Sequence, residues 1–151
     1  MADDPADLES PRLRRLYQDW LVRRRGRLLP ARSDFDILDL AYMLGDLNLL
    51  EVLRDPLRFR FRVHATNAVK LLGYDLTGKT VDDYPDPAYR DFVNEHYGGV
   101  VARREPRRIH RNPFATRDHI LRWEGLILPL AEDGESVDML MGGLDWSVTA
   151  R

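Results

Sequence analysis

The sequence contains no cysteine among its 151 residues. Without thiols the chain cannot form a disulfide, ligate zinc or an iron–sulfur cluster through cysteine, or attach a flavin through sulfur. Long apolar runs are also missing, since the longest, residues 125–131, is far shorter than the ~18 residues that a membrane span needs. The first ten residues are acidic, unlike the basic start of a secretory signal. We therefore expect a cytoplasmic protein that does not enter a membrane.

Signatures of catalysis are missing as well. The chain has no G-x-S-x-G, no H-E-x-x-H and no glycine loop for phosphate. Asp82 and Asp83 are adjacent, so their carboxylates do not face one another as an acid–base pair would. The histidines are His64, His96, His110 and His119, at spacings that match no compact metal motif. The sequence thus predicts no enzyme and no metal site, and it leaves any cofactor unidentified.

Lysine is scarce: the sequence contains only Lys70 and Lys79. Most of the positive charge therefore comes from arginine. The net charge is −2, unevenly spread. Residues 11–27 carry +6, from seven arginines against one aspartate, and residues 101–124 carry +4, from seven arginines against three acids. A negative net charge without aromatics among the arginines argues against a nucleic-acid partner. The helix dipole alone favours arginines at the end of a helix.

The first predicted element is an amphipathic helix that begins at Ser10-Pro11 and ends at Gly26. Serine is a good N-cap, proline suits the first helical turn, and glycine ends helices. Five apolar side chains recur at helical spacing: Leu13, Leu16, Tyr17, Trp20 and Leu21. We expect this stripe to pack against another apolar surface.

Strands and helices follow in a fixed order. The predicted strands are residues 47–54, 58–64, 107–116, 120–130 and 136–147. Between the second and third strands lie two predicted helices, at 67–72 and 87–104, the longer of which begins at Asp86-Pro87 and ends before Pro106. Blocks of antiparallel strands on either side of a helical segment indicate an α+β fold.

This order, and the motif LLGYDLTGKTVDDY at residues 71–84, resemble a PAS domain. LPARSDFDILDL at 29–40 and LRWEGLILPLAEDG at 121–134 are similar to small stand-alone PAS-like proteins of alphaproteobacteria. The resemblance covers about residues 28–147. It implies a five-stranded antiparallel sheet with helices on one face, and we divide the chain into residues 1–27, an acidic tail and amphipathic helix, and 28–151, the PAS-like domain.

The resemblance also implies a space for a ligand between the sheet and the helices. The side chains expected to line it are Phe59, Phe61, Phe92, Val93, His96 and Trp123. In PAS domains that bind haem, the iron ligand lies on the long helix, which here carries His96. We expect His96 to point inward without binding a metal, and a sensor for haem or another cofactor held by His96 is the alternative.

The last two strands are apolar on both faces, so both faces need cover. We expect Leu126, Leu128, Leu140 and Leu144 to share the outer face, beside the stripe of the N-terminal helix. If the helix covers only part of this face, the rest of both surfaces predicts a homodimer. The helix folding back to seal a monomer is the other outcome.

Together these features predict a PAS-like sensory or interaction domain that acts in bacterial signalling by protein contact. A small ligand would tune it, and a signalling protein such as a histidine kinase is the expected kind of partner besides a second copy. The ligand itself is not predicted.

Overall fold

A computed structural model describes residues 3–115 and 119–150, with the side chains of residues 3–110 and 122–146. One antiparallel sheet has the strand order β2-β1-β5-β4-β3. Its strands are β1 (Leu47–Leu53), β2 (Arg58–Val63), β3 (Arg107–Ala115), β4 (His119–Leu130) and β5 (Met139–Ala150). The predicted five-stranded antiparallel sheet is confirmed, although β5 begins at Met139 rather than at 136.

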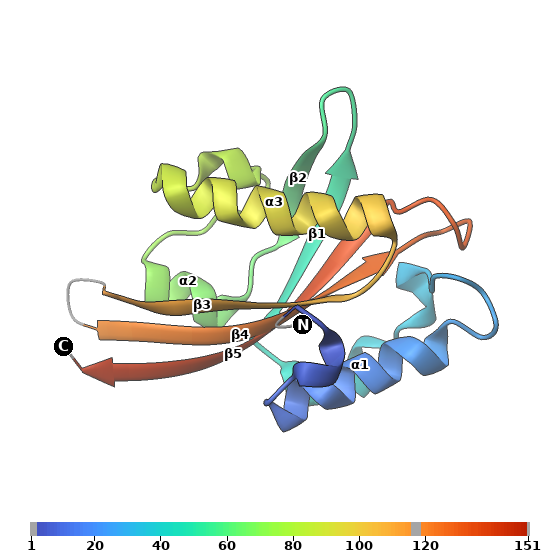
Figure 1. The fold of residues 1–151 in the computed structure, drawn as a ribbon, viewed down its shortest axis with the longest axis horizontal. Coiled ribbons are helices and arrows are strands. Elements are labelled where there is room, and N and C mark those ends of the chain that lie inside the picture. Colours follow the sequence, from blue (N-terminus) through green and yellow to red (C-terminus); the bar gives the residue numbers. More distant parts are fainter. Residues whose placement is uncertain (1–2, 116–118, 151) are drawn as a thin grey trace.

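Three α-helices accompany the sheet: α1 (Pro11–Arg23), α2 (Thr66–Leu72) and α3 (Pro87–Arg103). The short 3-10 helices are η1 (Pro5–Asp7), η2 (Arg32–Asp34), η3 (Ile37–Met43) and η4 (Val81–Asp83). The segment from α2 to α3 is inserted between β2 and β3, as the sequence predicts, and it covers one face of the sheet. Figure 1 shows α3 running along that face and α1 lying on the opposite side.

The helix α1 forms where its signals lie in the sequence. The Ser10 side chain accepts a hydrogen bond from the backbone N–H of Leu13, and Pro11 takes the first helical position. Leu13 and Leu16 are fully buried against the strands, where Gly143 leaves room for them. The indole of Trp20 donates to the carbonyl oxygen of Pro129 at 2.9 Å. α1 is therefore packed into the same core as the sheet.

This packing corrects the expectation that α1 leaves part of the outer face, at Leu126 and Leu128, for a second copy. Leu126 and Leu128 are fully buried, beneath α1 of the same chain. Of the helix stripe, Tyr17 and Leu21 alone remain half-buried, while the other three members are covered. The apolar surfaces of the helix and of the sheet face are removed from water by packing on each other within one chain, which requires no partner.

The expectation that Leu126, Leu128, Leu140 and Leu144 share one face of the sheet is also wrong. Leu126 pairs with Gly143, and Leu144 pairs with Gly125. Paired residues of an antiparallel sheet point to the same side, and neighbours along a strand alternate. Leu140 and Leu144 consequently face α2 and α3, opposite to Leu126 and Leu128. Alternation along a strand is visible in a sequence, whereas the register between two strands is not.

Candidate ligand-binding interior

The space between the sheet and α3 is filled with aromatic rings. Phe59 and Phe61 of β2 are buried. Phe59 meets the ring of Tyr97 edge-on at 5.5 Å, and Phe61 meets Tyr84 in the same manner at 6.0 Å. Burial raises the pKa of both tyrosine hydroxyls above the ordinary 10, so the two phenols stay neutral. The interior is thus aromatic, and these two hydroxyl groups are uncharged at neutral pH.

His64 brings a polar group into this interior. It follows β2 directly and is 5 % exposed. Its Nδ1 accepts a hydrogen bond from the backbone N–H of Leu76 at 3.0 Å. Burial lowers the pKa of His64 below its ordinary 6.5, and the carboxylate of Asp75, 3.8 Å away, opposes that shift without cancelling it. The ring is therefore neutral at pH 7, with its hydrogen on Nε2.

Three buried nitrogens of this region have no hydrogen-bond partner among the residues that the structure describes: His64 Nε2, Trp123 Nε1 and Trp146 Nε1. The indole nitrogens can only donate, and the tautomer of His64 makes its Nε2 a donor as well. Buried polar groups in proteins almost always have a partner. Three unsatisfied donors therefore lie in one region of the interior.

All three side chains line a small cavity, here called the interior void, of about 20 Å³. Its other lining residues are Asn48, Ala68, Leu72, Tyr84, Tyr89, Val93, Tyr97, Ile109, Ile127 and Leu144. This volume suits about one water molecule, while sites for larger ligands span roughly 300–1,000 Å³. A ligand larger than water therefore requires α2 or α3 to move away from the sheet.

The structure places four of the predicted ligand-binding residues at or beside the interior void and two outside it. Val93 and Trp123 line the interior void, and Phe59 and Phe61 lie in the aromatic layer beside it. Phe92 and His96 are half-buried and outside its lining.

Sequence reasoning missed Tyr97, Trp146 and His64. Tyr97 had a usable signal, because it lies four residues after Val93 and three before Val100, the helical spacing of a buried stripe. His64 had no such signal in the sequence, because strand alternation places it on the polar face of β2. The pairing of β1 and β2 shifts register at Leu49/Leu50, and the chain leaves the strand after Val63.

His96 faces an arginine. Its Nδ1 lies 3.3 Å from Nη1 of Arg107, and its ring contacts Phe92 at 4.6 Å. Burial, and then the Arg107 guanidinium, lower the pKa of His96. The described residues contain no cluster of three or more His, Cys, Asp or Glu side chains that could hold a metal ion. With a guanidinium 3.3 Å away and a position outside the lining of the interior void, His96 does not fit the role of a haem ligand.

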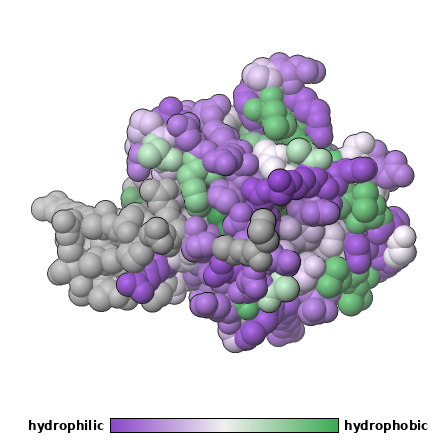
Figure 2. All heavy atoms as spheres, viewed as in Figure 1, coloured by the Kyte–Doolittle hydropathy of each residue, from purple (hydrophilic) through white to green (hydrophobic). Residues whose placement is uncertain are grey.

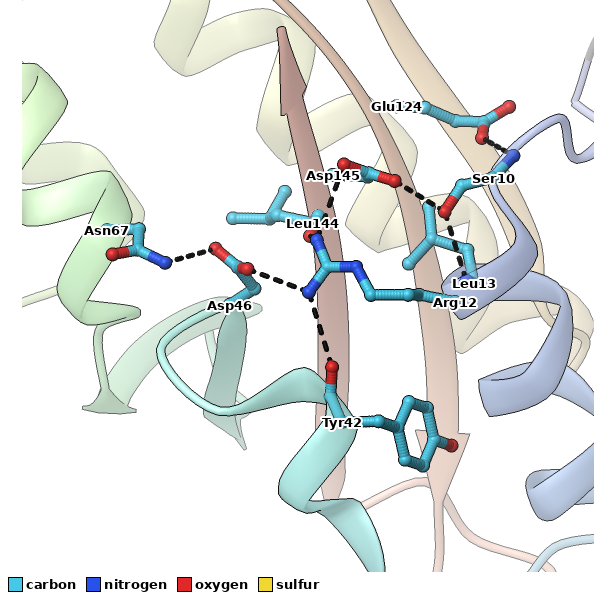
Figure 3. A network of polar contacts seen from close by, with 9 residues as sticks. All are labelled: Ser10, Arg12, Leu13, Tyr42, Asp46, Asn67, Glu124, Leu144 and Asp145. Atoms are coloured by element: carbon cyan, nitrogen blue, oxygen red, sulfur yellow. Dashed lines mark hydrogen bonds and ion pairs between the residues drawn. The ribbon is translucent and has the colours of Figure 1, made fainter.

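A polar network connects the start of α1 with the sheet and with α2 (Figure 3). Arg12 donates to Asp46 at 3.0 Å and to Asp145 at 3.3 Å. Asp46 also accepts from the amide of Asn67, on α2, at 2.9 Å. Ser10 donates its hydroxyl to Asp145 at 2.6 Å. α1 is thereby linked to the helix that borders the interior void.

Glu124 anchors the N-terminal end of α1 to β4. Its carboxylate accepts from the backbone N–H of Ser10 at 2.8 Å and of Glu9 at 3.0 Å, and from Arg108 Nε at 2.7 Å. Burial opposes ionisation, but these hydrogen bonds outweigh it and lower the pKa of Glu124. The carboxylate is therefore charged and fixed at neutral pH.

The surface is largely hydrophilic on the side drawn in Figure 2, with separate apolar areas. The exposed large apolar side chains include Ile37, Leu38 and Leu44, on or beside η3, which are 66 %, 79 % and 81 % exposed. No helix within the described residues is long and apolar enough to cross a membrane.

Comparisons with known proteins agree with this architecture. The family model for the PAS domain matches residues 8–145, and the chain belongs to that family. The match includes all of α1. PAS domains are in general sensory domains of signalling proteins rather than catalysts.

A solved structure is similar as well. The PAS domain from Bordetella pertussis BvgS aligns with a TM-score of 0.52 and 18 % identity, over 73 % of this chain and 85 % of that one. At this identity the likeness concerns the fold alone. Comparison with curated proteins finds no significant match.

Proposed function

We propose that this PAS domain is a sensor whose interior binds a small hydrogen-bond acceptor and whose α1 passes the bound state to a protein partner. The observation that carries the proposal is the trio of buried, unpartnered donors around the interior void: His64 Nε2, Trp123 Nε1 and Trp146 Nε1. Leaving such donors unpaired costs roughly 1–3 kcal/mol each, so an acceptor that pairs them binds favourably.

The lining defines the ligand's chemistry further. Tyr84, Tyr97 and His64 are neutral, and the remaining lining is mostly apolar. A bare charge would have to be desolvated there without a counter-charge, which is costly. A small molecule with a carbonyl oxygen and an apolar body meets both conditions, and a water molecule is the minimal acceptor.

The path to α1 runs through the sheet and through the polar network. Trp123 and Trp146 lie on the inner side of β4 and β5, and α1 covers the outer side of the same strands. A displacement of these strands acts on Leu16, which lies against Gly143. A movement of α2 acts on Arg12 through Asn67 and Asp46.

The partner is proposed to be a second copy of the chain or a signalling protein such as a histidine kinase. Light scattering at tens of micromolar, with and without a bound acceptor, tests the homodimer. Because α1 is sealed onto its own sheet, ligand-dependent assembly would require that contact to loosen.

The indole N–H signals provide a direct test of the interior site. We expect titration with acetone, a neutral acceptor, to shift the Trp123 and Trp146 indole resonances downfield in ¹H–¹⁵N spectra. The Trp20 indole is an internal control, because it already donates to Pro129. Trp→Phe variants assign the three signals. Equal shifts of all three, or no shift up to solvent-effect concentrations, would contradict the proposal.

A further inference from the structure

A second hollow, separate from the interior void, lies between the N-terminal segment, α1 and the corner that joins α3 to β3. Its volume is about 590 Å³, within the range of small-molecule sites. Four arginines line it: Arg24 directly after α1, Arg103 and Arg104 at the end of α3, and Arg107 at the start of β3. We call it the arginine groove. Figure 1 shows α3 turning into β3 beside the N-terminal segment.

The four guanidinium groups are not neutralised by ion pairs. Among the described residues, none of them forms a salt bridge with a carboxylate, although Asp3, Asp4 and Glu105 also line the groove. The guanidinium of Arg24 lies 5.2 Å from the Trp20 ring centroid, and its buried Nε has no hydrogen-bond partner within the described part of the chain. The helix dipole accounts for Arg103 and Arg24, each at the C-terminal end of a helix, but not for Arg107, which begins β3.

The backbone of α3 leaves space for Arg107. A Cβ on Gly99 would lie 2.7–2.9 Å from the Arg107 guanidinium, whereas a Cβ on Gly98 would meet nothing within 4 Å. Glycine inside a helix lowers its stability relative to alanine. At position 99 the loss is accompanied by a structural gain. The missing side chain lets the Arg107 guanidinium lie against α3 and line the groove.

Apolar side chains also line the groove. Tyr17, Leu21 and Leu28 line it, and Leu28 is 46 % exposed. Guanidinium groups match the planar, bidentate geometry of phosphate and carboxylate, and an apolar side chain nearby adds contact for a hydrocarbon group. The groove therefore presents both halves of a site for an amphipathic anion.

We propose that the arginine groove binds a soluble organic phosphate, a phosphate monoester that carries a short apolar group. The phosphate lies among Arg24, Arg103 and Arg107, and the apolar group lies against Tyr17 and Leu28. The carboxylates of Asp3 and Asp4 weaken the binding by repulsion. This site is independent of the interior acceptor site.

Calorimetric titration with hexyl phosphate, inorganic phosphate and hexanol tests the proposal. We expect hexyl phosphate to bind at least about tenfold more tightly than either fragment, because only it uses both halves of the groove. Arg103→Gln should weaken its binding about five- to tenfold. Lys70→Gln removes one positive charge from an exposed site on α2 and should leave binding unchanged.

The two glycines of α3 give a matched pair that preserves the fold. Gly99→Ala displaces the flexible end of Arg107 and should weaken hexyl phosphate binding about threefold or more, while Gly98→Ala should not. Trp146→Phe, in the interior site, should leave groove binding unchanged, so the two sites are distinguished. Sedimentation with phosphatidylglycerol vesicles should show no binding.

Four results would overturn the proposal. The first is that hexyl phosphate does not bind at millimolar concentration, and the second is that hexanol binds as tightly as hexyl phosphate. The third is that Arg103→Gln and Lys70→Gln weaken hexyl phosphate binding equally. The fourth is vesicle binding that depends on Arg103, which would assign the groove to lipid headgroups instead.

Discussion

The two faces of the sheet are closed in different ways. On the outer face, α1 is capped by Ser10, tied to β4 by Glu124 and hydrogen-bonded through the Trp20 indole. On the inner face, the indole nitrogens of Trp123 and Trp146 are buried but have no hydrogen-bond partner among the described residues. Paired polar groups rigidify a contact, while unpaired ones store free energy that a ligand can release. We infer that the outer face maintains the fold and the inner face does the sensing.

The largest expected effect comes from opening the outer face. Leu16→Ala removes a fully buried side chain of α1 and should lower the free energy of unfolding by about 3 kcal/mol. Val22 lies on the same helix but is 72 % exposed, so Val22→Ala should change it by less than about 0.5 kcal/mol. Urea unfolding measures both. Equal effects of the two substitutions would mean that α1 is not packed as described.

Neighbouring glycines of β5 allow a comparison of the two faces at one place. A Cβ on Gly143 would lie 2.6 Å from Leu16 and 3.0 Å from Leu13, on the outer face. A Cβ on Gly142 would lie 3.5 Å from Ile127, at ordinary contact distance, on the inner face. Gly143→Ala should therefore destabilise the protein by about 2 kcal/mol, as overpacking does, and Gly142→Ala should not.

Thermal and urea unfolding of this pair also test the register of β5. A shift of one residue would exchange the two faces and reverse the order of the two effects. Gly142→Ala also bears on the interior site, because its added methyl group lies next to Ile127, which lines the interior void. The Trp20 indole lies on the other face of the sheet, so its resonance should stay in place.

Much of the fold could be predicted from local signals. Ser10-Pro11 and Asp86-Pro87 mark the starts of α1 and α3, and the alternation of Phe59 and Phe61 identifies the buried side of β2. These features depend on residues close together in the chain, which a single sequence shows directly.

The candidate site could be predicted only in part, because it depends on contacts between distant segments. Trp123 was expected in the interior, but Trp146 becomes its neighbour only through the β4–β5 register. His64 turns inward because the β1–β2 pairing shifts near its end of β2. Leu144 was assigned to the wrong face for the same reason, since no local pattern fixes how two strands align.

The smallest expected effect is a pH dependence that arises on the inner face. Burial lowers the pKa of His64 in the folded protein below 6.5, the value expected when it is unfolded. The unfolded chain then binds the proton more readily, so stability is full above pH 6.5 and falls as the pH drops through that value toward the folded pKa. His64→Asn should reduce this fall between pH 7.5 and pH 5.

His96 contributes in the same direction, because its pKa is also lowered, and His96→Gln measures its share separately. The carboxylates with lowered pKa, such as Glu124 and Asp34, have ordinary values near 4, so their contribution is lost only at lower pH. Urea unfolding at pH 7.5, 6.5, 5.5 and 5 isolates the histidines. A fall that persists undiminished in both variants would show that His64 is not held neutral by burial, and that its Nε2 is not the donor that the interior site requires.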